Sequence, residues 1–314
     1  MQLLRSIDDL PDSLRGGAVS IGNFDGVHRG HARIVERLRA MAKSVGGPSI
    51  VFTFDPHPVR LLRPEQVPPP LTWTDRKAEL LAELGIDAVI AYPTDETLLA
   101  LTAEQFFTQI VRERLAARGM VEGPNFYFGK NRAGNITLLA QLCAAARMQL
   151  EILRPLIAGD AIVSSSRIRD LVACGDVDQA RSLLTQPYRI RGMVTHGAAR
   201  GSKIGFPTAN VDAIDTLLPA HGVYAGRAYV SEDDWPAAIN IGPAPTFGEQ
   251  LVKVEAHLIG FQGSLYGEPM EVEFLSRLRG VQAFASIDEL KSQLATDVAA
   301  TVEIARSTND ANPQ

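Results

Sequence analysis

The chain has 314 residues, of which 46% are apolar and 21% charged, and its formal net charge is −5. This length predicts two domains, each able to bury its own core. The negative charge, with no basic tract, disfavours general binding to nucleic-acid backbones. No secretory signal and no apolar run of about 20 residues is visible. We therefore expect a cytoplasmic protein in which Cys143 and Cys174 are reduced structural thiols.

The first half of the sequence alternates short apolar runs with helical patterns. Strands are predicted at residues 18–21, 49–54, 88–92, from 120 onward and at 150–153. Helices are predicted at residues 34–45, 74–84, 102–118, 136–148, 165–174 and 176–184. Strands separated by helices predict an α/β domain with a doubly wound parallel sheet. Ligands of such sheets bind at the carboxyl ends of the strands.

The pattern changes after residues 186–187, where short alternating runs follow one another between Gly and Pro turns. Strands are predicted at residues 188–195, 222–230, 237–241, 252–259 and 271–278. This spacing is typical of an antiparallel barrel or sandwich. A capping box at residues 286–289 begins a last helix that we expect to end near residue 305. The predicted domains are therefore residues 1–184 and 185–306, followed by a disordered tail at 307–314.

The turn between the first strand and the first helix contains the densest set of candidate functional residues. It reads GNFDGVHRGH from Gly22 to His31. His28 and His31 are three residues apart at the start of a helix, so both rings can face one bound group. Helix N-termini bind anions favourably, and glycines allow close backbone approach. Each histidine alone is explained more simply as a helix cap, but the whole run favours a nucleotide phosphate site.

Four further motifs follow in order: TFDPHP at residues 53–58, GPNFYFG at 123–129, SSSRIR at 164–169 and GFPTAN at 205–210. With GNFDGVHRGH, they resemble the bacterial bifunctional riboflavin kinase/FAD synthetase family over essentially the whole chain. The resemblance implies a Rossmann-like nucleotidylyltransferase domain followed by a flavokinase barrel. It implies phosphorylation of riboflavin to FMN, then adenylyl transfer from ATP to FMN with release of pyrophosphate. The expected ligands are ATP, riboflavin, FMN and Mg²⁺, with no nucleic acid or membrane as partner. The sequence leaves the oligomeric state open.

The resemblance also assigns residues to the adenylyl-transfer site. His28 and His31 would contact the ATP phosphates as catalytic residues. The other expected ATP-binding residues are Gly22, Asn23, Phe24, Gly30, Ser165, Ser166 and Arg169, and the expected FMN-binding residues are Pro56, His57, Pro58, Asn125 and Phe128. The family usually has Thr at the position of Ser166, which keeps the hydroxyl. From residue type alone, Ser165 could equally be a helix N-cap and Phe128 a core residue.

For the kinase site the resemblance makes Glu255 the general base, although its alternating strand by itself predicts only a solvated face. Thr208 and Asn210 would supply oxygen ligands to Mg²⁺. The expected ATP-binding residues are Gly197, Gly201, Lys203, Gly205 and Pro207, and Arg279 would border the riboflavin pocket. Ser202 and Val281 depart from the family, which commonly has a basic and an acidic residue there.

Two other functions are compatible with parts of the sequence. The first half alone could belong to a different nucleotidylyltransferase or to a tRNA synthetase. The attached barrel, and the lack of a KMSKS-like stretch and of a basic anticodon-binding region, disfavour this hypothesis. A flavin carrier without turnover is the second alternative. The presence of all the candidate catalytic and metal-binding residues disfavours it, namely His28, His31, Thr208, Asn210 and Glu255. Copurifying flavin without pyrophosphate release would favour it.

Overall fold

The structure is a computed structural model that describes residues 1–8, 10–197, 201, 204–243 and 252–310. The chain forms two compact units. The first comprises Met1–Pro68 and Trp73–Ser164, and the second comprises Pro69–Thr72 and Ser165–Gln314. The helices between residues 165 and 183 thus group with the second unit in space. Where the functional domains divide stays a prediction.

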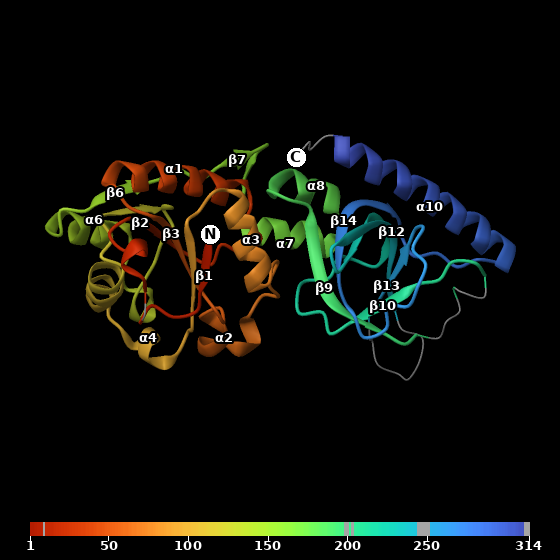
Figure 1. Ribbon diagram of the computed structural model, residues 1–314, viewed down its shortest axis with the longest axis horizontal. Helices are drawn as coiled ribbons and strands as arrows, with labels where there is room; N and C mark the ends of the chain where they lie inside the picture. Colours follow the sequence, from red (N-terminus) through yellow and green to blue (C-terminus); the bar gives the residue numbers. More distant parts are fainter. Residues whose placement is uncertain (9, 198–200, 202–203, 244–251, 311–314) are drawn as a thin grey trace. The chain divides into compact units, whose positions relative to one another are not determined.

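The first unit is built on a parallel sheet of six strands in the order β1-β4-β3-β2-β5-β6 (Figure 1). The strands are β1 (Gln2–Leu4), β2 (Ala18–Ile21), β3 (Ser49–Phe54), β4 (Ala88–Tyr92), β5 (Gly119–Glu122) and β6 (Gln149–Ile152). The predicted doubly wound sheet is confirmed, and β1 adds an edge strand too short to show alternation. The strand order reverses between β2 and β5, which makes their carboxyl ends the expected ligand crevice.

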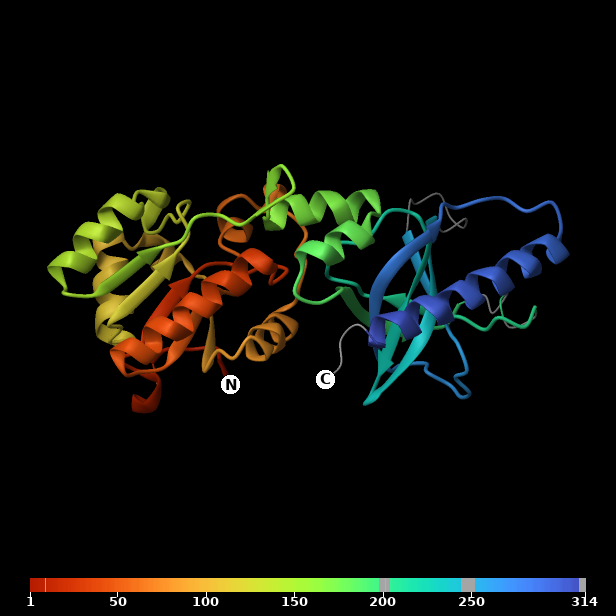
Figure 2. The same ribbon diagram turned by 90° about the horizontal axis from the view of Figure 1, so that it is seen from above.

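Alternate residues of the strands enter two separate cores, which is why both faces of the sheet are apolar. Val51 and Val89 pack with α1 (Arg29–Val45) and α3 (Thr74–Glu83) on one face. On the other face, Ile50 and Ile90 pack with α4 (Glu96–Ala100), α5 (Ala103–Phe106), η3 (Phe107–Arg114) and α6 (Ile136–Ala145). Figure 2 shows helices on both sides of this sheet. Short elements complete the unit: η1 (Asp12–Leu14), α2 (Val59–Leu62), η2 (Pro64–Gln66), η4 (Lys130–Arg132) and the hairpin β7 (Ile157–Ala158) and β8 (Ala161–Ile162).

The helix predicted at residues 102–118 is shorter than expected. Its capping box is confirmed, since Thr102 and Gln105 exchange side-chain and backbone hydrogen bonds. The helix then widens into a π-helix that ends at Arg114. Ala116 adopts a left-handed φ of 48°, and the Leu115 carbonyl accepts from Gly16 N–H instead of from a further helical turn. Tertiary pairing therefore overrides the helical pattern here.

The second unit is a closed barrel with strand order β10-β13-β12-β11-β14-β9 and antiparallel pairing between neighbours. The strands are β9 (Tyr188–Thr195), β10 (Ala209–Asp212), β11 (Gly222–Val230), β12 (Asp233–Pro243), β13 (Val252–Leu258) and β14 (Pro269–Arg279), and the helices are α7 (Ser165–Cys174), α8 (Val177–Leu183) and α10 (Ile287–Asp310). Of the two architectures expected, the barrel is the one formed. Strand β10 had not been predicted.

Helix α10 runs past its expected end near residue 305 to Asp310. In its last turns, Ser307 and Thr308 both donate side-chain hydrogen bonds to the Ile304 carbonyl. The predicted disordered tail can therefore begin no earlier than residue 311, and residues 311–314 lie outside the described part.

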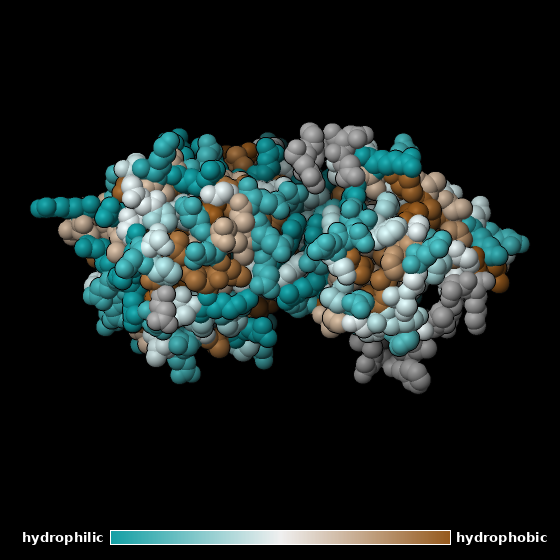
Figure 3. All heavy atoms as spheres, viewed as in Figure 1, coloured by the Kyte–Doolittle hydropathy of each residue, from teal (hydrophilic) through white to brown (hydrophobic). Residues whose placement is uncertain are grey.

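Apolar side chains reach the surface between hydrophilic ones in Figure 3. Within the described residues, no helix has the length and apolar character required to cross a membrane.

Candidate active sites

The turn that follows β2 has a backbone that most side chains avoid. Phe24 and Val27 both have left-handed φ values, 48° and 36°. For a β-branched residue such as valine this conformation is a true outlier, so the surrounding structure must enforce it. Both side chains are buried in the core beneath α1, and Gly22 N–H donates to the Phe52 carbonyl of β3. The turn is therefore held in one geometry at the carboxyl edge of the sheet, where strained backbone commonly marks a functional site.

His28 and His31 form a stacked pair at the start of α1. Their ring centroids are 3.6 Å apart and the ring planes differ by 13°. Each backbone N–H donates to Nδ1 of the other histidine, at 3.2 and 3.3 Å. Because both Nδ1 atoms accept, the single hydrogen of each neutral ring must be on Nε2. The capping role and the phosphate-binding role are thus compatible, since capping uses Nδ1 and leaves two Nε2–H donors.

Both imidazoles are held in the neutral form. Burial lowers the pKa of His28 to about 4, although Asp25 opposes the shift. Burial also lowers the pKa of His31 well below its usual value, and protonation of His28 and the positive charge of Lys77 would act in the same direction. At neutral pH the pair therefore offers hydrogen bonds rather than formal charge to an anion. Gly30 makes room for the pair, because a Cβ there would lie 3.0 Å from the His28 ring.

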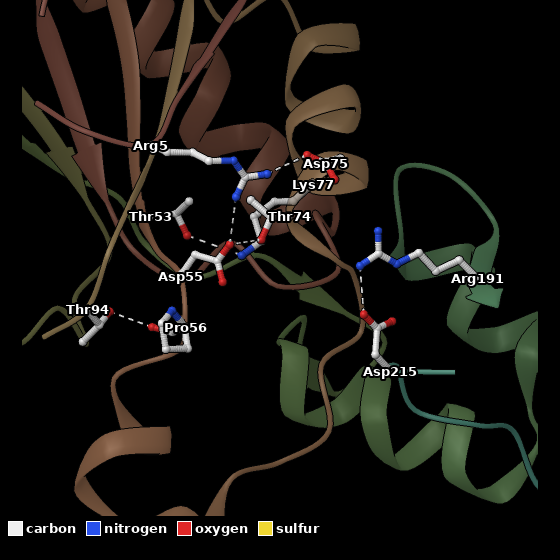
Figure 4. A network of polar contacts seen from close by, with 10 residues as sticks. All are labelled: Arg5, Thr53, Asp55, Pro56, Thr74, Asp75, Lys77, Thr94, Arg191 and Asp215. Atoms are coloured by element: carbon white, nitrogen blue, oxygen red, sulfur yellow. Dashed lines mark hydrogen bonds and ion pairs between the residues drawn. The ribbon is translucent and has the colours of Figure 1, made fainter. Parts of the chain in front are cut away.

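The loop after β3 carries the residues predicted to bind FMN. His57 is held at both ring nitrogens: Val59 N–H donates to Nδ1 at 3.1 Å, and the Asn23 side-chain amide lies 2.7 Å from Nε2. Thr94 donates to the Pro56 carbonyl at 2.6 Å, as Figure 4 shows. Pro58 follows directly as the N-cap of α2. The structure thus brings Asn23 of the predicted ATP set into contact with the predicted FMN loop.

The remaining residues predicted for this site differ in burial and in the unit to which they belong. Asn125 is exposed after β5, whereas Phe128 is buried in the core and stacks on Phe126 with centroids 5.2 Å apart. Packing is therefore the role that the position of Phe128 favours. Ser165, the first residue of α7, belongs to the second unit together with Ser166 and Arg169. Arg169 Nε donates to the Pro69 carbonyl at 3.0 Å. The participation of α7 in the adenylyl-transfer site stays a prediction.

Two buried ionisable residues were missed by sequence reasoning. Glu122 ends β5 and accepts a hydrogen bond from Ile21 N–H at 2.7 Å, and burial raises the pKa of Glu122 well above its usual value. Lys77 in α3 is 8% exposed, and its Nζ lies 3.4 Å from Thr53 Oγ1. In the sequence, Glu122 looks like an ordinary strand end and Lys77 like a solvated helix residue. Neither position carries a local signal of burial.

The second candidate site lies on the outer face of the barrel. Asn210 of β10 and Asn240 of β12 are both directly opposite Glu255 of β13. Val254 and Ala256 on either side of Glu255 are buried in the barrel, so alternation directs Glu255 outward. Asn240 Nδ2 donates to Glu255 Oε2 at 3.3 Å. The predicted base and one predicted metal ligand are therefore neighbours in a polar row across three strands.

The segment before β10 is closed by its own backbone and by β13. Gly201 accepts from Phe206 N–H at 2.9 Å, and Gly205 has a left-handed φ of 93°. The Pro207 carbonyl lies 2.6 Å from Nδ1 of His257, two residues beyond Glu255 on the same strand. Thr208, the next residue, is exposed.

Close packing explains the predicted glycine that follows β9. A Cβ on Gly197 would lie 2.0 Å from Asn210 Nδ2, so only glycine leaves the Asn210 amide in its place. Lys203 and Ser202 lie outside the described residues.

Arg279 donates from Nε and Nη2 to the buried Asp297 of α10, so its guanidinium ties the last helix to β14. A direct contact of Arg279 with riboflavin stays a prediction, and Val281 is exposed.

Comparison with known proteins matches both halves of the chain to sequence families. The sequence model for FAD synthetase matches residues 10–167, and that for riboflavin kinase matches residues 184–305. A bifunctional riboflavin kinase/FMN adenylyltransferase of Pseudomonas fluorescens is 36% identical over 97% of this chain and 98% of its own length. The protein of that description from Escherichia coli K12 is 35% identical over 95% of this chain and 96% of its own length. A crystal structure described as a macrolide-efflux protein from Streptococcus pneumoniae has a TM-score of 0.84 and 28% identity, covering 95% of this chain and 97% of that one.

The two sequence models match the chain in the order of its two architectures, the parallel sheet first and the closed barrel second. The relatives align over nearly their whole length, so no large part of either chain is left unmatched. The resemblance inferred from the five motifs is thereby confirmed. The chain belongs to the bifunctional riboflavin kinase/FMN adenylyltransferase family.

Proposed function

We propose that this chain converts riboflavin to FAD in two steps, each using one ATP. The second unit would phosphorylate riboflavin to FMN, and the site at the carboxyl edge of the parallel sheet would transfer AMP from ATP to FMN. The observation that carries the proposal is the presence in one chain of two distinct polar sites. One is a neutral, stacked histidine pair on a helix N-terminus, and the other is an Asn–Glu–Asn row on a barrel.

In the adenylyl-transfer step, a phosphate oxygen of FMN attacks the α-phosphorus of ATP. The bond from that phosphorus to the pyrophosphate oxygen breaks, so no covalent enzyme intermediate is required. Catalysis then consists of positioning and of stabilising the charge that grows on the phosphate oxygens. The Nε2–H groups of His28 and His31, together with the N-terminus of α1, are suited to donate to those oxygens. Asn23 and His57 would hold the turn and the FMN loop together beside them.

In the kinase step, the terminal ribityl hydroxyl of riboflavin attacks the γ-phosphorus of ATP, and ADP leaves. The Glu255 carboxylate is the group that we assign to accept the hydroxyl proton. Asn240 donates to one oxygen of this carboxylate, which leaves the other oxygen to face the substrate. Asn210 is directly opposite Glu255, so a γ-phosphate held near Asn210 would lie close to the base.

Mg²⁺ is the cation that we assign to the kinase site. Thr208 and Asn210 present a hydroxyl and an amide oxygen, which are the hard donors that Mg²⁺ prefers, and Gly197 leaves space for the Asn210 amide. Among the described residues, no group of three or more His, Cys, Asp or Glu side chains could enclose a metal ion. The donor set fits an ion held by two protein oxygens and by ATP. When bound, Mg²⁺ would neutralise charge on the phosphates.

The proposal is tested by following FMN, FAD and pyrophosphate over time in one incubation of the chain with riboflavin, ATP and Mg²⁺. We expect FMN to appear first and FAD to follow with pyrophosphate. Glu255→Gln should abolish FMN formation while added FMN still becomes FAD. His28→Ala should abolish FAD formation while riboflavin still becomes FMN. Flavin binding without pyrophosphate release would instead identify a carrier, and loss of both steps in either folded variant would contradict the division of labour.

A further inference from the structure

A buried lysine lies near the histidine pair and has no role in the steps described above. Lys77 is in the first turn of α3, is 8% exposed, and its Nζ lies 3.4 Å from Thr53 Oγ1 (Figure 4). Burial lowers the pKa of Lys77, and the charges of Asp25 and Asp55 oppose the shift. A cation in a protein interior is costly unless nearby polar groups compensate it. Two carboxylates from two different loops supply that compensation here.

Lys77 interacts electrostatically with residues of both loops of the predicted adenylyl-transfer site and contacts Thr53 between them. Asp25 belongs to the turn after β2, and Asp55 begins the loop after β3. Thr53, to which Lys77 donates, donates in turn to the Asn23 carbonyl at 3.1 Å. A chain of two hydrogen bonds therefore runs from α3 to the turn that carries His28. Lys77 also lies close enough to His31 to lower the pKa of that imidazole.

The start of α3 is itself anchored to the second loop. Thr74 Oγ1 donates to Asp55 Oδ2 at 2.7 Å, and Arg5 Nη1 lies 3.3 Å from the same oxygen. Thr74 and Lys77 are three residues apart in α3, so both side chains lie on the face turned toward the end of β3. Figure 4 shows these side chains gathered around Asp55. The first turn of α3, which carries Lys77, is therefore held against the loop after β3.

We propose that Lys77 is a positioning residue for adenylyl transfer, and that its ammonium sets the spacing between the histidine turn and the FMN loop. The inference rests on the proposed function of that site. Without the ammonium, the buried Asp25 carboxylate would lose a compensating charge and the Thr53 hydroxyl would lose its donor, whereas Asp55 would keep Arg5. The turn and the loop would then separate, and the Nε2–H groups of the histidines would no longer meet the ATP phosphates in the reactive geometry.

The test is Lys77→Met in the full-length chain, because methionine keeps the length and apolar stem and removes the charge. We expect kcat/KM for ATP in the conversion of FMN to FAD to fall at least about tenfold, since a small misplacement of phosphate ligands is costly. Riboflavin phosphorylation in the same preparation should stay within about twofold, which gives an internal control for protein quality. Lys43→Met, an exposed lysine of α1, is the matched control and should change neither step.

A purely structural role predicts a different result. It would lower the urea midpoint of the first unit and leave kcat/KM of the folded protein unchanged. Because Lys77→Met leaves the buried Asp25 carboxylate without a compensating cation, some loss of stability is expected in either case. The fall in kcat/KM of the folded protein is therefore the readout that separates the two roles. Trp73, buried in the first unit, reports that midpoint by fluorescence once Trp235 of the second unit is changed to Phe.

Thr53→Val provides an independent variant, because it interrupts the hydrogen-bond chain and leaves the charge in place. It should lower kcat/KM for ATP in FAD synthesis by about threefold to tenfold. If Lys77→Met does not fold, the kcat/KM of Thr53→Val in FAD synthesis tests whether Lys77 positions the site. FAD synthesis within about twofold of the native rate in every folded variant would overturn the inference. If the native chain itself made no FAD from FMN, the proposed function would fail instead, so the two failures are distinguishable.

Discussion

The neutral histidine pair predicts that the first unit loses stability in mild acid. The pKa of His28 is about 4 in the folded chain, against 6.5 for an exposed histidine. Below pH 6.5 the unfolded chain binds a proton at this position that the folded chain does not. Stability therefore falls as the pH falls from 6.5 toward 4. For one group with these two pKa values, the loss is close to zero at pH 7.5 and about 2 kcal/mol at pH 5, or about 30-fold in the folding equilibrium.

His28→Asn isolates this contribution. Asparagine is among the best helix N-caps, so its side chain can still accept from His31 N–H, but it does not titrate between pH 5 and 7.5. The assay is urea unfolding at both pH values in the Trp235→Phe background, where Trp73 reports the first unit. The native chain should lose about 2 kcal/mol more than the variant between pH 7.5 and pH 5. Equal losses in the two proteins would refute the reasoning, since His28 would then titrate alike in both states.

Two further predictions concern other residues. Burial raises the pKa of Glu122 above its unfolded value, so the native chain should lose stability as the pH rises from about 4.5. Glu122→Gln should therefore have a higher urea midpoint than the native chain at pH 8 and the same midpoint near pH 4. A higher midpoint for the native chain at pH 8 would contradict this assignment. His257→Ala should free the Pro207 carbonyl and lower kcat/KM for ATP in riboflavin phosphorylation by about tenfold. The reason is that the contact between His257 and the Pro207 carbonyl would hold the backbone next to Thr208. Conversion of FMN to FAD should be unchanged, as should both steps in the exposed control His221→Ala. An unaffected kinase step in His257→Ala would show that this contact does not position Thr208.

Local patterns of residue types are enough to predict the fold class and the family of this chain. Apolar periodicity is a local property, so it indicates the strands around Val19 and Ile50 and the change to an antiparallel pattern after residue 187. The glycine-rich motifs are local as well, because each needs a particular backbone over a few residues. Gly30 is an example, since a Cβ there would crowd the side chain of His28 two residues earlier. These constraints act over short distances along the chain, so they can be read from it.

Which polar residues are buried, and what they contact, becomes visible only in the folded chain. Lys77 and Glu122 look like solvated residues in their elements, and the neighbours that enclose them come from distant segments. The pairing of Arg279 with Asp297 likewise joins β14 to a helix that follows it. Asn240 becomes a partner of Glu255 only when β12 pairs with β13. Burial and pairing depend on which strands and helices become neighbours, and a one-dimensional pattern of residue types does not record that.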